Sequence, residues 1–127
     1  MTVRQLSTDF AILKPDLAID TITANAELYR RLDEDYQQFQ NHTLISRYNF
    51  SRDWGQWERH PAGDEMVLLL SGQFTLVVDN GDTTEYLHLQ QPGDYAIVPK
   101  GSWHTVQTDT TSEALFITPG EETQHRE

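Results

Sequence analysis

The sequence contains no cysteine. Without thiols there is no disulfide, no thiolate metal site and no cysteine nucleophile, so any chemistry must come from histidines, carboxylates and hydroxyl groups. Long apolar runs are also missing. The longest, Met66 to Leu70, is too short for a membrane span or for the core of a signal peptide. We therefore expect a cytoplasmic protein that does not interact with membranes.

Basic residues are scarce. The chain has 9 Lys and Arg against 20 Asp and Glu, which gives a formal net charge of -11. This charge repels the phosphates of nucleic acids and of anionic membrane surfaces, so neither is an expected partner. A solvated acidic surface explains most of the carboxylates, and the position of each in the sequence decides which are candidate metal ligands.

The first part of the chain has a helical pattern. With 127 residues, of which 37% are hydrophobic, the chain fits one domain of roughly 100 to 150 residues. Within residues 24–40, Leu28, Leu32, Tyr36 and Phe39 recur at helical spacing, and Thr23 is the expected N-cap. We predict a helix about 24–40 in an N-terminal extension, 1–41, that packs on the outside of the domain or on a partner subunit.

After residue 42 the pattern changes to that of short strands. Runs rich in β-branched and aromatic residues alternate with turn residues at intervals of roughly ten. Asn80-Gly81 predicts a hairpin with a type I′ turn. This rhythm predicts an all-β jelly roll or barrel over residues 42–119 rather than a parallel α/β sheet. Residues 120–127 are expected to be a polar, loosely ordered tail. The expected strands are 44–50, 56–60, 66–70, 74–78, 85–89, 95–98, 104–107 and 114–118.

Four side chains are candidates for one site. Glu58 and His60 lie two apart in an expected strand, so both point to the same face. Glu65 follows a turn-prone segment that would return its carboxylate toward this pair. His104 is distant in the sequence, but a barrel places distant strands side by side. Spacing alone does not separate a metal site from a chance pair of surface residues.

Two segments resemble the conserved motifs of the cupin superfamily. Glu58 to Gly72 is similar to the first motif, G-x5-H-x-H-x3–4-E-x6-G, and Gly93 to Thr108 is similar to the second, G-x5-P-x-G-x2-H-x3-N. Arg52 replaces the opening glycine, Thr108 replaces the final asparagine, and Glu58 replaces the first histidine. The resemblance, which is to small single-domain cupins, implies a double-stranded β-helix, or jelly-roll barrel.

The resemblance also implies a metal site. Cupins bind metal through two histidines and a glutamate of the first motif and the histidine of the second, which correspond here to Glu58, His60, Glu65 and His104. Two histidines and two carboxylates bring the net charge of a divalent site near zero and favour Mn²⁺ or Fe²⁺ slightly over Zn²⁺ or Ni²⁺. The alternative is a cupin whose site has decayed, with Glu58 no longer a ligand and metal bound weakly or not at all.

The function stays open between two classes. One is a metalloenzyme that acts on a small organic molecule by dioxygenase, isomerase or lyase chemistry, with Glu58 as the candidate that moves protons. The other is a non-catalytic sensor or binding module for a small ligand or metal. Tyr48 and Phe50 alternate onto one face and are expected to line the ligand pocket. Open sheet edges and the helical stripe predict a homodimer.

Overall fold

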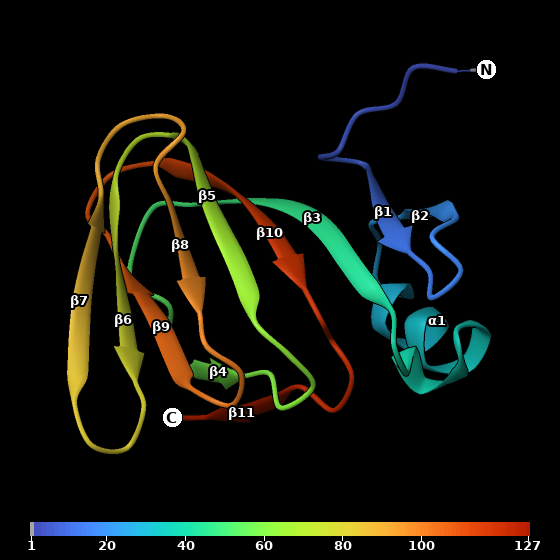
Figure 1. Ribbon diagram of the computed structural model, residues 1–127. Coiled ribbons are helices and arrows are strands. Elements are labelled where there is room, and N and C mark those ends of the chain that lie inside the picture. The colour runs from blue at the N-terminus through green and yellow to red at the C-terminus, as the bar shows by residue number, and fades with distance from the viewer. Residues whose placement is uncertain (1) are drawn as a thin grey trace.

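The computed structural model describes residues 2–127 and consists of two antiparallel sheets that face each other, with one short helix at the side (Figure 1). The larger sheet has the strand order β2 (Ile19–Thr23), β1 (Asp9–Leu13), β3 (Thr43–Phe50), β10 (Ser112–Thr118), β5 (Glu65–Ser71), β8 (Tyr95–Val98). The smaller sheet has the order β11 (Gln124–Arg126), β4 (Trp57–Arg59), β9 (Trp103–Gln107), β6 (Phe74–Asp79), β7 (Thr84–Leu89).

The main hydrophobic core lies between the two sheets. Alternate residues of each strand point inward, as period-2 sequences require, and Leu69, Leu76 and Val106 are fully buried there. Gly72, the last glycine of the first motif, has a φ of 78°, and a Cβ at this position would lie 2.3 Å from the carbonyl oxygen of Thr111. Only glycine satisfies both constraints where β5 turns into β6.

The prediction of an all-β jelly-roll barrel is confirmed. Each of the eight expected strands is present, with ends within two residues of those predicted. The loop of the predicted hairpin is longer than expected, because Asp79 and Thr84 are its last paired residues. The type I′ prediction is wrong, since Gly81 has positive φ but Asn80 does not. Instead, the Asn80 side chain accepts hydrogen bonds from the backbone of Asp82 and Thr83 and stabilises a wider turn.

The N-terminal third differs from the prediction. Residues 9–23 form β1 and β2, which extend the larger sheet beside β3. The helix α1 is shorter than predicted and spans Leu28–Asp35. Thr23 is not its N-cap, because Thr23 is paired with Asp9 in the sheet. The helix ends early because residues 37–39 adopt φ values of 55° to 59°, which are left-handed and form the short 3-10 turn η1 (Gln37–Phe39).

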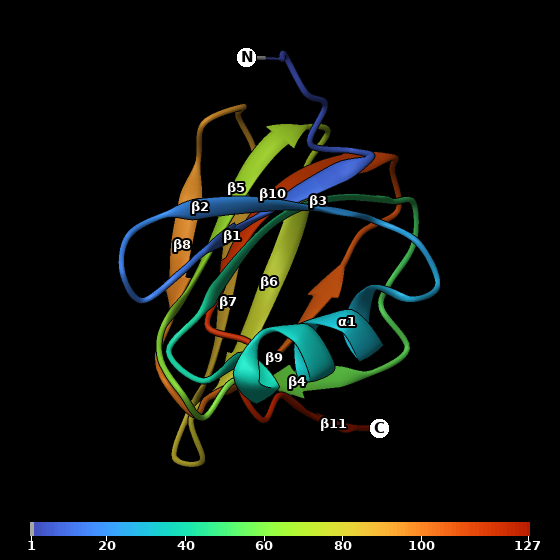
Figure 2. The same cartoon turned by 90° about the vertical axis from the view of Figure 1, so that its right-hand side faces the viewer.

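The helix packs outside the main core. Leu28, Leu32 and Phe39 are buried in a second hydrophobic cluster with side chains of β1, β2 and β3. Figures 1 and 2 place α1 at one end of the barrel, in front of the space between the two sheets. Among residues 2–127, no helix combines the length and the apolar character needed to cross a membrane.

The C-terminal segment is not the loose tail that we predicted. Gln124–Arg126 forms β11, which pairs with β4 at the edge of the smaller sheet. The guanidinium of Arg126 lies 4.5 Å from the ring centre of Trp103 and 5.3 Å from that of Trp57. It is also 3.1 Å from a carboxylate oxygen of Asp79. These cation–π and ionic contacts hold a strand whose sequence is entirely polar.

Candidate metal centre

The structure brings the four predicted site residues together. Glu58 lies on β4 directly opposite His104 on β9, so the two side chains are neighbours across the smaller sheet. His60 follows the end of β4, and Glu65 begins β5 in the facing sheet. His104, Glu65 and His60 are buried, whereas the side chain of Glu58 is 31% exposed.

The spacing of the ligand atoms suits one ion. Glu58, His60 and His104 each place one ligand atom within 4.8 Å of the others. Glu65 Oε1 lies 3.0 Å from His104 Nε2, and Glu65 Oε2 lies 3.3 Å from His60 Nε2. Glu58 Oε2 is 3.9 Å from both imidazole Nε2 atoms. Ligands held at about 2.1 Å from a common ion lie about 3 to 4 Å apart, so the distances of each carboxylate to the two histidines fit. Glu65 lies next to both histidines but is not part of the three-residue group that includes Glu58.

Buried polar atoms at the site lack hydrogen bonds. Within residues 2–127, His60 Nε2, Glu65 Oε1 and His104 Nε2 have no hydrogen-bonding partner, although all three are inaccessible to solvent. Glu65 Oε1 and His104 Nε2 are close enough for a hydrogen bond but are not aligned for one. A buried polar group without a partner is costly. A divalent cation would satisfy all three atoms, so the residues present fit a metal.

The electrostatics of Glu65 depend on the two histidines. Burial alone would raise the pKa of this carboxyl, but the adjacent imidazoles of His104 and His60, when protonated, lower it to about 2. Glu65 is therefore a carboxylate in the folded protein at neutral pH. An ionised carboxylate is also the form that binds a metal.

Hydroxyl and imidazole groups outside the predicted set hold three of the four side chains. Thr118 Oγ1 donates a hydrogen bond of 2.6 Å to Glu65 Oε2. Thr123 Oγ1 lies 2.9 Å from His60 Nδ1, and His125 Nε2 lies 3.3 Å from Glu58 Oε1. Because a carboxylate only accepts, His125 is the donor to Glu58. The sequence analysis missed Thr118, Thr123 and His125, since they lie outside the two motifs.

The contact with Thr123 sets the tautomer of neutral His60. The Thr123 hydroxyl donates its single hydrogen to the carbonyl oxygen of Gly120, at 3.2 Å. It must then accept from His60 Nδ1, which places the imidazole proton on Nδ1. The lone pair of Nε2 is left pointing toward Glu65 and Glu58, as a metal ligand requires.

A pocket of about 680 Å³ opens beside this group. Glu58, His60 and Glu65 line it, as do Tyr48 and Phe50, the two residues expected to form a ligand pocket. Other lining residues come from α1, η1 and the C-terminal segment. Tyr29 lies on α1, and its hydroxyl is hydrogen-bonded at 3.0 Å to the hydroxyl of Tyr48. Burial, followed by this hydrogen bond, raises the pKa of Tyr48, so its phenol stays protonated.

Comparison with known proteins identifies the family. The profile described as the Cupin domain matches residues 51–120, which is more than half of the chain. This chain belongs to the cupin family. No curated protein matches it.

Solved structures share the fold. Protein NMB1881 from Neisseria meningitidis has a TM-score of 0.51 and 18% identity, with 60% of this chain and 72% of that chain covered. Hydroquinone 1,2-dioxygenase from Sphingomonas sp. TTNP3, solved with 4-hydroxybenzoate bound, has a TM-score of 0.52 and 17% identity, with 60% and 58% covered. Oxalate decarboxylase from Bacillus subtilis, described with Mn(II) centers, has a TM-score of 0.53 and 19% identity, with 67% and 23% covered.

These structures establish the fold and not the reaction. Their sequence identities to this chain are below 20%, and one barrel of this kind supports many unrelated functions. This chain also spans only 58% of the dioxygenase and 23% of the decarboxylase.

Proposed function

We propose that this cupin binds one divalent transition metal through Glu58, His60, Glu65 and His104, and that it acts on a small organic molecule in the adjoining pocket. The observation that carries the proposal is the convergence of buried, unpartnered ligand atoms on His60, Glu65 and His104. The two carboxylates favour Mn²⁺ or Fe²⁺ over Zn²⁺ or Ni²⁺, because oxygen donors suit harder ions.

The protein's own groups are arranged for proton transfer as well as for binding. A metal bound here would polarise an oxygen atom of the substrate. Glu58 is the most exposed of the four ligands and faces the pocket, and His125 donates a hydrogen bond to it. A carboxylate and an imidazole within hydrogen-bonding distance form a pair that can accept and return a proton. Dioxygenase, isomerase and lyase reactions all need such a transfer or a polarised oxygen.

The second candidate is a non-catalytic module that binds a metal or a small ligand. The apolar part of the pocket, with Phe50 and Phe116 in its wall, supports this reading. The presence of His125 next to Glu58 supports the enzyme reading, because a binder has no need of an acid–base pair.

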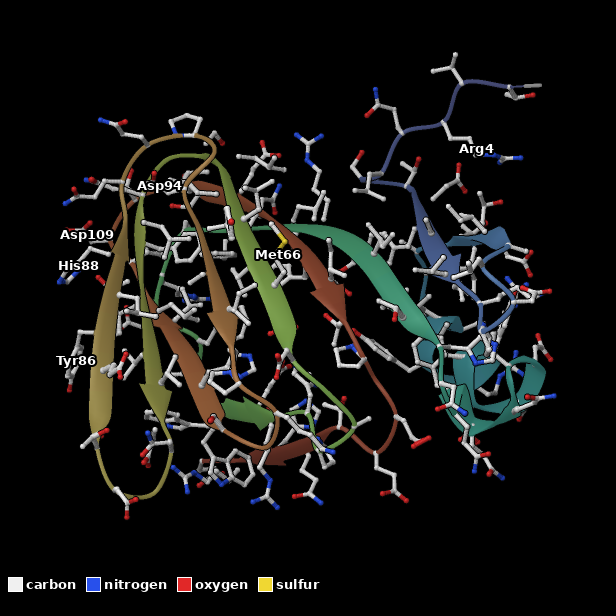
Figure 3. All side chains as sticks on the ribbon, in the orientation of Figure 1. Arg4, Met66, Tyr86, His88, Asp94 and Asp109 are labelled. Atoms are coloured by element: carbon white, nitrogen blue, oxygen red, sulfur yellow. The ribbon has the colours of Figure 1, made fainter. Side chains whose placement is uncertain are left out.

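Metal analysis tests the proposal directly. Tag-free protein, purified and then reconstituted with Mn²⁺, Fe²⁺, Zn²⁺ or Ni²⁺, is analysed by inductively coupled plasma mass spectrometry. We expect near one ion per chain in the wild type and a large loss in His104→Ala. The matched control is His88→Ala, which removes an exposed histidine that points outward from β7 (Figure 3). Absence of metal from the reconstituted wild type would overturn the proposal.

We also propose that the chain forms a homodimer. The outer strands β2 and β8 end the larger sheet, and Ile19, Tyr95 and Ile97 on them are exposed. Pairing of such an edge with a second copy would bury apolar side chains and satisfy backbone groups. Light scattering coupled to size-exclusion chromatography measures the mass, and a mass of one chain at micromolar concentration would contradict the proposal.

A further inference from the structure

The pocket beside the candidate metal centre has a nearly continuous aromatic wall. Trp54 packs against Phe50 with ring centres 5.9 Å apart and against Phe116 at 5.9 Å, and Tyr48 lies 6.0 Å from Phe116. All four residues line the pocket, and Tyr29 and Phe39 add further rings. Aromatic walls offer a large apolar contact area and prefer ring-shaped ligands that stack or meet them edge-on.

The charged groups of the pocket are almost all acidic. Asp33, Glu58, Glu65 and Glu122 line it, whereas neither Lys nor Arg is among the lining residues from the described part of the chain. Glu58 and Glu65 would balance the charge of a divalent ion. Asp33 and Glu122 are then left as uncompensated negative charges, on a protein whose net charge is already -11.

An anionic ligand is disfavoured in these surroundings. It would lose hydration on entering a pocket with an apolar wall. Neither lysine nor arginine lines the described pocket to replace the lost interaction, and its two histidines, His60 and His125, already face Glu65 and Glu58. A neutral ring avoids this penalty. A cationic ring is attracted by Asp33 and Glu122 and, through cation–π contacts, by the aromatic wall.

We propose that the pocket selects uncharged or cationic aromatic molecules and discriminates against carboxylates and phosphates. The proposal rests on the proposed function, of which it names the ligand class. By this proposal the pocket differs in ligand charge from one that binds oxalate and from one that binds 4-hydroxybenzoate, the ligand in the dioxygenase structure.

The test uses three probes of similar size that share a hydroxyphenyl ring and differ in charge: 4-hydroxybenzylamine, 4-hydroxybenzyl alcohol and 4-hydroxybenzoate. Dissociation constants are measured by isothermal titration calorimetry at neutral pH on the metal-free and the Mn²⁺-loaded protein. We expect the benzoate to bind at least about tenfold more weakly than the alcohol in both forms, and the amine to bind at least as well as the alcohol. The comparison in the Mn²⁺-loaded protein is the stricter test, because the carboxylate of the benzoate could bind the metal and so gain affinity.

Paired variants locate the source of the discrimination. The double variant Asp33→Asn/Glu122→Gln should reduce the preference against the benzoate. The control Glu85→Gln/Asp109→Asn removes the same charge from positions outside this pocket, with Asp109 at the edge of the molecule opposite α1 (Figure 3). It should leave the preference unchanged. Equal effects of the two double variants would mean that the net charge, and not the pocket, sets the preference, which contradicts the proposal.

The outcomes separate this inference from the proposed function. Benzoate binding as tight as that of the alcohol, or no binding of any probe at millimolar concentration, overturns the ligand class even if metal binds. The expected ranking in metal-free protein, together with no metal uptake, supports the ligand class and overturns the proposed metal centre.

Discussion

Thr123 accepts a hydrogen bond from His60 at 2.9 Å, although 63 positions separate the two residues in the sequence and the chain between them forms most of the barrel strands. The threonine thereby holds the imidazole ring in place with its Nε2 lone pair facing Glu65. Loss of a group that orients a metal-binding histidine in this way typically lowers metal affinity about 10- to 100-fold.

Replacement of this hydroxyl should weaken metal binding while leaving the fold intact. Thr123→Val keeps the shape of the side chain but removes the acceptor, so we expect metal affinity to fall about 10- to 100-fold. Competition with a chromophoric chelator measures the affinity. Thr123→Ser restores the hydroxyl and should bind metal almost as the wild type does. Equal affinities for the valine variant and the wild type would show that the contact does not orient His60.

The cation–π contacts of Arg126 should hold the C-terminal strand in place. Arg126→Ala removes the guanidinium from the rings of Trp57 and Trp103, and we expect a loss of about 1 to 2 kcal/mol in the local stability of β11. Faster amide hydrogen exchange in Gln124–Arg126 and Trp57–Arg59 would report this loss. Arg4→Ala, on the exposed N-terminal segment (Figure 3), is the control and should leave this exchange unchanged.

The sequence predicted the barrel well because short runs rich in β-branched and aromatic residues are separated by turn residues at regular intervals. Leu69, Leu76 and Val106 lie in such runs and are fully buried. The four site residues were found through the resemblance of two segments to the cupin motifs, because spacing alone does not separate a metal site from a chance pair of residues. The structure gathers these residues, and their role as metal ligands stays a prediction.

The rest of the fold was missed for different reasons. Phe10 and Ile12 alternate and are buried in β1, so a signal was present, but the family resemblance began only near residue 42. The strand β11 carried no such signal, because its three residues are all polar and exposed. Its pairing depends on tertiary contacts with Trp57 and Trp103, which a local pattern does not contain. Thr123 and His125 were missed with it.

The acid sensitivity of the metal-free protein should depend on Glu65. Its pKa is lowered in the folded state from 4.5 to about 2. The ionised carboxylate therefore stabilises the fold above pH 4.5, and this contribution is lost as the pH falls from 4.5 toward 2. Urea denaturation of the metal-free protein at several pH values measures the loss. Glu65→Gln cannot ionise, so the difference in unfolding free energy between wild type and variant should shrink as the pH falls; a pH-independent difference would contradict the assignment.

Restoration of the first motif histidine should change the preference of the site for metals. Glu58→His gives three imidazoles and one carboxylate, which adds a nitrogen donor and leaves a divalent site with a net charge of about +1. Nitrogen donors suit Zn²⁺ and Ni²⁺ better than Mn²⁺. We expect the ratio of Zn²⁺ to Mn²⁺ affinity, measured by competition titration, to rise at least about tenfold.

The control for this prediction is Glu58→Gln, which removes the negative charge without supplying an imidazole. It should weaken the binding of both ions, since a neutral amide is a poorer ligand than either side chain. His125 donates a hydrogen bond to the Glu58 carboxylate, and this favours the charged oxygen donor over a neutral one. If the histidine and glutamine variants gave the same affinity ratio, Glu58 would act on the metal only through its charge from a distance, and the site would consist of His60, Glu65 and His104 alone.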